Sequence, residues 1–420
     1  MLLLGAILPV RQAINNYTDE VVRNNLSVLL QESSKEEYVL DYEKLRFNIF
    51  TQRISLLNFR IYPADSAKLS AEFDSSLSSF YGININRVDL QLEKEWEIFL
   101  DKKLFIKQLK VTEPTVRIHQ KKTSDKKIKF AQISGDIYQT VTQYLSLLKL
   151  YSFEVVDART DYSLFQEGES QRFTFDPISF KLKNFRVKEG TRENAKLFFT
   201  DDVEFFSGKQ QFTLPDSSHR ISFDRFKIST INNQIEFYNL RVKPLKADSI
   251  TENQLNVFVP ALKLKSVDFE RAYLDNEYLV KTLSIERPAI KLNINKSQKP
   301  KSEQQIDELE KWLNLIVVNS TRITKGNIAV NDNRGKSRKT YLVNGISLKI
   351  QGAKVDTSIL DKLELSSLQD NYRLSVHELM HQIPEEELLI SIKDIDYSSI
   401  TELFKCGAVE ISPNEMKQQQ

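Results

Sequence analysis

The sequence predicts a mainly β protein built from repeated antiparallel strands, with few and short helices. Apolar residues alternate with polar ones over most of the chain, which is the pattern of strands with one dry face and one wet face. One irregular strand pattern also occurs twice, as LFIKQLKVTEPTVRIHQKK at 104–122 and as YLVKTLSIERPAIKLNINK at 278–296. An irregular pattern seldom recurs by chance, so the two copies indicate an internal repeat.

The irregularity is a change in the phase of the alternation. Apolar residues stand at odd positions at Leu109 and Val111 and at even positions after Pro114, and the same change surrounds Pro288. Successive strand side chains point to opposite faces, so a change of phase requires an extra residue, a bulge or a bend. Proline is tolerated at such a point but not in a regular central strand. We therefore expect each strand to be bulged or bent at its proline.

The composition argues against several functional classes. The 420 residues include 59 Lys and Arg against 57 Asp and Glu, so the formal net charge of +2 gives no overall attraction to nucleic acid. The single cysteine, Cys406, excludes an internal disulfide framework and a thiolate metal cage. Eleven glycines leave little material for phosphate-binding loops, and no Walker or dinucleotide fingerprint occurs. We predict no catalytic, cofactor-binding or metal site and no enzymatic activity.

Residues 1–10, MLLLGAILPV, carry no charged or polar side chain. A spanning helix needs about 20 apolar residues, so this segment cannot cross a bilayer alone. It also lacks the basic n-region of a signal peptide. Two interpretations stay open, a frayed apolar terminus and a partial hydrophobic anchor. Residues 11–35 are expected to form an N-terminal helix, because Ile14, Tyr17 and Val21 recur at helical spacing.

Strands are predicted to begin near residue 38 and to form two full repeats and part of a third. The first β repeat covers 36–210, the second 211–372, and an incomplete third 373–420. The segment NFRIYP at 58–63 matches NLRVKP at 239–244, at an offset of 181 residues. The offset between Pro114 and Pro288 is 174 residues. The loops therefore change length while the strands persist.

Each full repeat is expected to carry one short helix after its proline strand. Residues 136–151 have an amphipathic pattern, with Tyr144 and Leu148 on its apolar side. A second helix is expected to begin at Ser302 and to present an apolar face that extends to Ile316. We expect both helices to pack across one end of the sheet.

His377, Glu378 and His381 form a literal H-E-x-x-H sequence. On a helix the two histidines would share a face and bind zinc, with the glutamate as general base, which is the signature of a zinc hydrolase. Pro384 lies three residues past the second histidine and would end such a helix almost at once. The apolar phase around the motif is that of a strand. We interpret the segment as a strand and keep a zinc hydrolase only as a distant alternative.

The repeated proline phrase resembles the AsmA-like family of bacterial envelope proteins, the TamB- and AsmA-type proteins with a repeating β-groove. Glu113-Pro114 and Arg287-Pro288 stand where the family phrase has its proline, and the resemblance covers roughly residues 1–397. It implies a long, curved antiparallel sheet with an apolar concave face that carries phospholipid acyl chains between membranes. It also implies attachment to the inner membrane through the N-terminus, a groove in the periplasm, and possible protein partners in the envelope.

A dry sheet face agrees with that expectation, because it must be covered by another layer or by a ligand. Acyl chains gain about 0.8 kcal/mol for each buried methylene, so lipid is a suitable filler. The candidate groove residues are Leu109, Val111, Leu283 and Ile285, although the alternation does not tell which face is concave. The alternative is a structural or adhesive β-solenoid whose dry face closes on itself or on a protein partner.

Overall fold

The structure is a computed structural model of the whole chain. It describes residues 38–48, 51–64, 80–93, 102–121, 138–139, 141–143, 145–166, 169–190, 199–213, 219–245, 253–274, 277–295, 315–334, 338–356, 371–383 and 387–413. The predicted anchor at 1–10, the predicted helix at 11–35 and the start of the helix expected from Ser302 lie outside these ranges.

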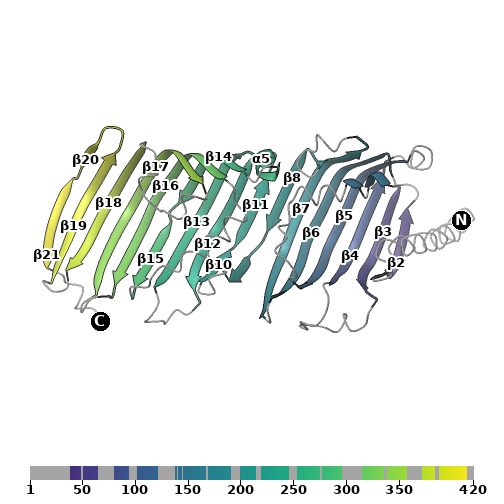
Figure 1. Cartoon of the computed structure of the whole chain (residues 1–420), viewed down its shortest axis with the longest axis horizontal. Coiled ribbons are helices and arrows are strands. Elements are labelled where there is room, and N and C mark those ends of the chain that lie inside the picture. The colour runs from purple at the N-terminus through teal and green to yellow at the C-terminus, as the bar shows by residue number, and fades with distance from the viewer. Residues whose placement is uncertain are drawn as a thin grey trace, which may run out of the picture. The chain divides into compact units, whose positions relative to one another are not determined.

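The chain divides into two compact units, residues 1–208 and 209–420, and strands make up most of each (Figure 1). The prediction of a mainly β protein is therefore confirmed. The predicted repeat boundaries remain predictions, because compact units do not by themselves define repeats. The strands of unit 1 are β1 (Tyr38–Asp41), β2 (Lys44–Asn48), β3 (Arg53–Pro63), β4 (Phe80–Leu92), β5 (Lys103–Lys121), β6 (Leu147–Gln166), β7 (Glu169–Lys188) and β8 (Asp202–Ser207).

Unit 2 contains thirteen described strands and one short helix. Its elements are β9 (Gln210–Thr213), β10 (His219–Phe223), β11 (Arg225–Ser229), β12 (Gln234–Pro244), β13 (Gln254–Val267), α5 (Phe269–Leu274), β14 (Glu277–Glu286), β15 (Ala289–Ile294), β16 (Leu315–Asp332), β17 (Lys339–Asp356), β18 (Tyr372–Ile383), β19 (Leu388–Ser398), β20 (Leu403–Lys405) and β21 (Ala408–Pro413).

The same order of strand pairings occurs in both units. In unit 1, β1 and β2 pair with β3, which pairs with β4, and in unit 2, β10 and β11 pair with β12, which pairs with β13. The registers correspond as well. Leu40 lies opposite Ile61 in unit 1, and Ile221 lies opposite Val242 in unit 2. Each residue of the unit 1 pair is 181 positions before its counterpart in the unit 2 pair, which is the offset found in the sequence.

The sheet is mostly antiparallel, with one parallel junction in each unit. Strand β6 runs parallel to β5, and β16 runs parallel to both β14 and β15. A parallel pair needs a crossover of a dozen or more residues, and residues 122–146 and 295–314 supply one at each junction. The alternating pattern identifies these strands but not the end at which the chain re-enters the sheet. The prediction of an antiparallel sheet is therefore wrong at these two junctions.

The helix predicted at 136–151 is shorter than expected. Residues 138–139 and 141–143 are helical, but β6 begins at Leu147. Leu148 therefore belongs to a strand, and pairs with Leu104 on one side and Val187 on the other. Ile316, expected on the second helix, likewise lies in β16 opposite Tyr278. In both places strand pairing overrides a local helical periodicity.

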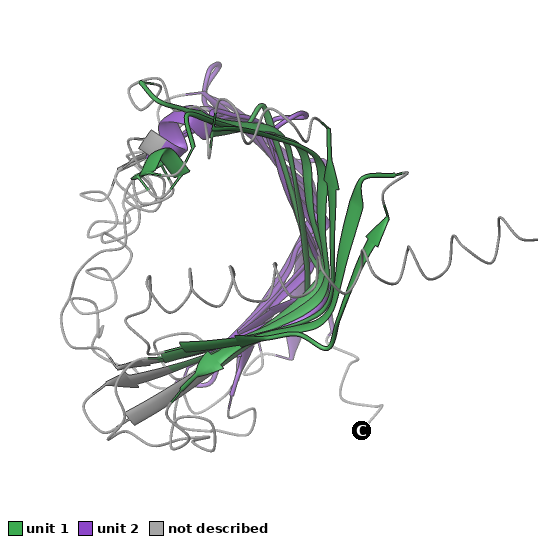
Figure 2. Cartoon of the chain, turned by 90° about the vertical axis from the view of Figure 1, so that its right-hand side faces the viewer, with its two compact units in different colours: residues 1–208 green, residues 209–420 purple. Residues whose placement is uncertain are grey.

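The predicted bend at each proline strand is confirmed. Glu113, with φ 51°, precedes Pro114, and Arg287, with φ 46°, precedes Pro288. A residue in this left-handed region turns the strand and shifts its alternation by one position. Apolar residues on either side of the corner therefore keep to one face. In unit 1, green in Figure 2, the strands bend along their length into an open C, and those of unit 2, purple, bend likewise.

A small core in unit 2 shows which face is the inner one. Val267, Val280 and Val318 are buried together, and Phe269 of α5 and Leu283 of β14 pack against them. Figure 2 places α5 on the concave side of the bent strands. The face that carries Leu283 is therefore the concave face, and α5 covers one end of it.

Candidate functional site

Cross-strand register joins the apolar residues of unit 1 into continuous rows. Residues directly opposite one another in a sheet share a face. One row crosses seven neighbouring strands and consists of Phe47, Ile54, Leu90, Leu109, Phe153, Leu182 and Val203. The row beside it consists of Leu45, Leu56, Val88, Val111, Val155, Phe180 and Phe205. These two rows form an uninterrupted surface, the unit 1 apolar face.

Unit 2 has a corresponding pair of rows, the unit 2 apolar face. The first consists of Phe226, Phe237, Leu262, Ile285, Ile323, Leu348, Leu374 and Tyr397. The second consists of Ile228, Ile235, Leu264, Leu283, Thr321, Ile350 and Tyr372. The four residues predicted from the sequence thus lie on these faces, Leu109 and Val111 in unit 1 and Leu283 and Ile285 in unit 2.

The unit 1 apolar face is hollowed into a pocket of about 480 Å³. Its lining is entirely apolar and consists of Leu109, Leu150, Phe153, Phe180, Leu182, Phe185, Val203 and Phe205. The rings of Phe153 and Phe180 meet edge to face, with their centroids 5.2 Å apart. The volume lies within the range of about 300–1,000 Å³ that is usual for small-molecule sites. Without a polar lining atom to direct a hydrogen bond, this pocket suits an alkyl chain.

Only one of the predicted residues, Leu109, lines this pocket. Its companions come from β6, β7 and β8, which lie 41 or more residues further along the chain. Their alternation is visible in the sequence, but the register that brings Phe153 beside Leu109 depends on the parallel junction. The phenylalanines at alternating positions were the sequence signal for this pocket. The pairing of the strands decides which of these phenylalanines come into contact.

The opposite face of unit 1 is polar, and its charges alternate in sign. Asp89, Lys110, Glu154, Lys181 and Glu204 follow one another across five strands. The Lys181 ammonium lies 2.6 Å from the Glu154 carboxylate, and this hydrogen bond is the main reason why the pKa of Glu154 is lowered. One face therefore suits solvent, and the other suits hydrocarbon.

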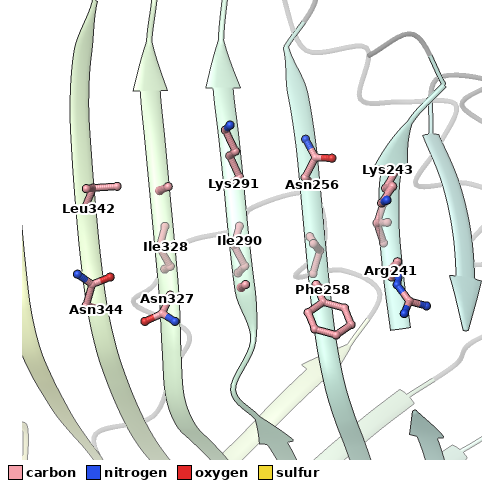
Figure 3. Close-up of a pocket in the computed structure, with 14 residues that line it drawn as sticks. Arg241, Lys243, Asn256, Phe258, Ile290, Lys291, Asn327, Ile328, Leu342 and Asn344 are labelled. Carbon is pink, nitrogen blue, oxygen red and sulfur yellow. The ribbon is translucent and has the colours of Figure 1, made fainter. Parts of the chain in front are cut away.

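Each unit also has a shallow basin on its polar face. In unit 2 it measures about 480 Å³ and lies over β12, β13, β15, β16 and β17, with Lys243, Asn256 and Lys291 in one row (Figure 3). In unit 1 a basin of about 600 Å³ lies at the corresponding place, beside Tyr62 and Arg117. The two basins lie at corresponding places but have different linings.

The H-E-x-x-H segment lies in strand β18, and its prediction as a strand is confirmed. His377 bonds to Asp394 across the sheet at 3.2 Å, and Glu378 accepts a hydrogen bond from Ser391 at 3.0 Å. His381 instead stacks on Tyr341, with the ring centroids 4.4 Å apart. The helical arrangement that would bring both histidines to one metal ion does not form.

The described ranges contain neither a metal-binding cluster nor a membrane-spanning helix. Among these residues, no group of three or more His, Cys, Asp or Glu side chains is arranged to hold a metal ion. Within the same part of the chain, no helix has the length and the apolar character that crossing a bilayer requires.

Comparisons with known proteins give no family. No family model matches the sequence, and no curated protein matches it. Among solved structures, the crystal structure of the sex pheromone staph-cAM373 precursor aligns over 78% of this chain and 88% of that chain, at 7% identity. Its TM-score is 0.12, a value at which the two folds cannot be equated.

Proposed function

We propose that this protein binds phospholipid acyl chains on its apolar faces and passes them between the membranes of a bacterial envelope. One observation carries the proposal, the apolar pocket within two unbroken apolar rows that cross seven strands of unit 1. In this proposal the bent sheet is a repeating β-groove. The protein breaks and forms no covalent bond, and its work is to keep hydrocarbon out of water.

Little of the described chain covers the apolar faces. Most members of the rows, including Leu109, Val111, Phe153 and Phe180, are only partly buried. Among the described residues the helical cover is α5 and the short segments near residue 140. A sheet with one apolar face must bury it against something. An acyl chain would do so at about 0.8 kcal/mol per buried methylene.

The same surface explains how a lipid could move. Rows of leucine, valine and phenylalanine hold a chain by area alone, because they offer no directional bond. A shift of the chain by one strand then exchanges one set of apolar contacts for a similar set. The headgroup would stay in solvent at the open side of the C. Selectivity for one headgroup is not expected from these faces.

Cellular placement is part of the proposal and follows the family resemblance. Residues 1–10 would form part of an anchor in the inner membrane, and the β units would stand in the periplasm. Envelope proteins are then candidate partners. Supporting evidence would be recovery of the full-length native gene product in the inner-membrane fraction and its protection from protease in intact cells.

Native mass spectrometry after mild extraction tests the proposal directly. We expect the wild-type chain to carry phospholipid and the double variant Phe180→Asp, Phe205→Asp to carry little, because two carboxylates would then face the apolar pocket. Arg186→Asp is the matched control, since this exposed residue lies on the same strand β7 outside the pocket lining. Circular dichroism checks that each variant is folded. A wild-type chain free of lipid would count against the proposal.

A protein-binding role is the second candidate, and the last strands favour it. Phe404, Val409 and Ile411 are exposed by 60%, 59% and 67%. Phe404 lies opposite Tyr397 and so extends an apolar row. An added strand from a partner could pair there and cover these side chains. Light scattering would distinguish the candidates, because this role predicts a stable complex or oligomer that Phe404→Asp abolishes.

A further inference from the structure

One cluster of cations in unit 2 has no counterpart in unit 1. The cluster consists of Arg287, Arg322, Lys325, Lys349 and Arg373, and we call it the basic patch. All five side chains are exposed. Arg322 lies directly opposite Lys349, which lies directly opposite Arg373, so three neighbouring strands carry like charges side by side. Like charges placed directly opposite destabilise a sheet.

The remaining two members stand at the corner of the bent strands. Arg287 and Lys325 both have positive φ, 46° and 53°. They lie on neighbouring strands, since the Arg287 amide donates to the carbonyl of Thr324, the residue before Lys325, at 2.7 Å. The patch therefore joins the corner to the row of like charges.

Unit 1 shows that the fold does not require these cations. The corresponding positions hold Glu113 and Asp157 at the corner, with φ 51° and 53°, and Glu154, Lys181 and Glu204 in the row. Four of the five charges are thus reversed between units. In unit 1 the row is internally neutralised, because Lys181 pairs with Glu154 at 2.6 Å.

In unit 2 the positive charge is left largely uncompensated. Arg373 pairs with Asp396 at 2.6 Å. Among the described residues, the other four members of the patch have no carboxylate partner within 4.0 Å. Because the whole chain has a net charge of only +2, this concentration is local and does not reflect a basic protein. Such an arrangement is stabilised when an anionic surface supplies the missing charge.

The neighbours of the patch indicate the kind of surface. Ser284, Glu286, Thr324, Ser347 and Ser375 lie beside it on the same face, and Glu286 pairs with Lys263 at 3.5 Å and not with a member of the patch. Protein interfaces depend on buried aromatic or aliphatic anchors, and the patch has none. Lipid headgroups need no such anchor, because each exposed Lys or Arg contributes through attraction to anionic lipid.

We propose that the basic patch docks unit 2 onto a membrane surface rich in anionic phospholipid headgroups. The direction of this inference rests on the proposed lipid function, since docking would bring the apolar faces to a lipid source or acceptor. The patch itself would recognise phosphate charge, and the acyl chains would be taken up elsewhere on the molecule.

The sharpest variant transfers the unit 1 residues into unit 2. Arg287→Glu, Arg322→Glu and Lys325→Asp install the acids that unit 1 carries at these positions, two of them at positive φ. Because unit 1 tolerates the same residues in the same local geometry, this triple variant is expected to fold. The control is Arg46→Glu, Lys107→Glu and Arg117→Glu, which makes the same change of charge at three exposed sites of unit 1.

Flotation with vesicles tests the docking. We expect wild type and control to float with vesicles of phosphatidylcholine containing about one third phosphatidylglycerol, and the unit 2 triple variant to bind about tenfold less or weaker still. Binding should fall as salt rises, and vesicles of phosphatidylcholine alone should bind none of the three. Equal binding by the unit 2 variant and wild type would overturn the proposal, and so would failure of wild type to bind.

A second measurement separates this proposal from the proposed function. Uptake of a fluorescent fatty acyl probe in the absence of vesicles should be the same for wild type and the unit 2 triple variant. If the protein takes up no acyl probe but still floats with vesicles in a patch-dependent way, the proposed lipid-transfer function is wrong and the docking proposal holds. If the patch instead mediates self-association or binds an acidic protein, light scattering would show a complex that the triple variant loses while vesicle binding is absent, which overturns the proposal.

Discussion

Single residues in the left-handed region keep each apolar face continuous around a bend. Asn58, Glu113 and Asp157 in unit 1, and Asn239 and Lys325 in unit 2, have φ between 49° and 53°. Only glycine adopts this region freely, and other residues are held there at a cost of about 1 kcal/mol or more each. The polar side chains at these corners are exposed or partly exposed to solvent. The backbone strain at these corners thus allows the apolar face to continue around the bend.

Lys325→Ile should destabilise the protein by about 1–2 kcal/mol, because a β-branched residue fits positive φ poorly. Lys325→Gly should be neutral or slightly stabilising. The matched control is Lys291→Ile, an exposed lysine in the extended strand β15 with no like charge opposite it, for which we expect a change below about 0.5 kcal/mol. Urea midpoints measure all three, and equal losses in both isoleucine variants would contradict the assignment of strain to the corner.

Asp332 should titrate well below an ordinary aspartate. The Arg334 guanidinium donates to it at 2.7 Å and the Arg334 amide donates at 3.1 Å, and together they lower the pKa of Asp332 to about 2. A lowered pKa in the folded state means that this pair stabilises the protein above the unfolded pKa of about 3.9 and stops doing so as pH falls through about 2. NMR titration should find this value, and Arg334→Gln should raise it. An unshifted Asp332 would show that the pair does not form in solution.

At the scale of elements, one parallel junction in each unit decides which strands become neighbours. The crossover after β5 places β6 beside it in the same direction, and the crossover after β15 does the same for β16. In unit 2 the short helix α5 packs where Val267, Val280 and Val318 from three strands meet. This core fixes β13, β14 and β16 to one another at the end of the apolar face.

Val280→Ala should therefore weaken unit 2 by about 2 kcal/mol, through lost burial and the small cavity left behind. Val280 is 3% exposed and lies at the centre of this core. The neighbouring Lys281→Ala is the control, since this side chain is exposed and its loss should change stability by less than about 0.5 kcal/mol. Urea unfolding followed by circular dichroism measures the difference. Indistinguishable midpoints would mean that the three valines do not form a core.

At the scale of the whole molecule, each unit combines an apolar face with a polar one, and the two units differ mainly in charge. The rows of unit 1 and unit 2 correspond in apolar character except at Thr321, which stands where unit 1 has Phe153. Four of the five compared charges are reversed. Hydrocarbon binding would thus be common to both units. Attachment to an anionic surface would be specific to unit 2.

A chain freed of lipid should bind an environment-sensitive apolar dye such as anilinonaphthalene sulfonate while fully folded. Oleate should displace the dye, because both would bury area on the same apolar faces. Phe180→Asp with Phe205→Asp should reduce the dye signal and Arg186→Asp should not. Fluorescence titration with circular dichroism on the same sample checks this, and a folded chain without dye binding would indicate closed apolar faces.

Alternation by itself predicted the mainly β class and the bend at Pro114 and Pro288, because the side-chain period of a strand is fixed by local geometry. It also placed Leu109 and Leu283 on the dry face and identified the H-E-x-x-H segment as a strand.

Tertiary structure decided the rest. The parallel junctions, the brevity of the helix expected at 136–151 and the identity of the concave face all depend on which strands pair and where a helix packs. The apolar pocket and the row of like charges likewise join residues that only register brings together. The physical reason is that alternation determines which of the two sheet faces a side chain occupies. Its neighbours on that face are determined by hydrogen bonds between strands that are distant in the sequence.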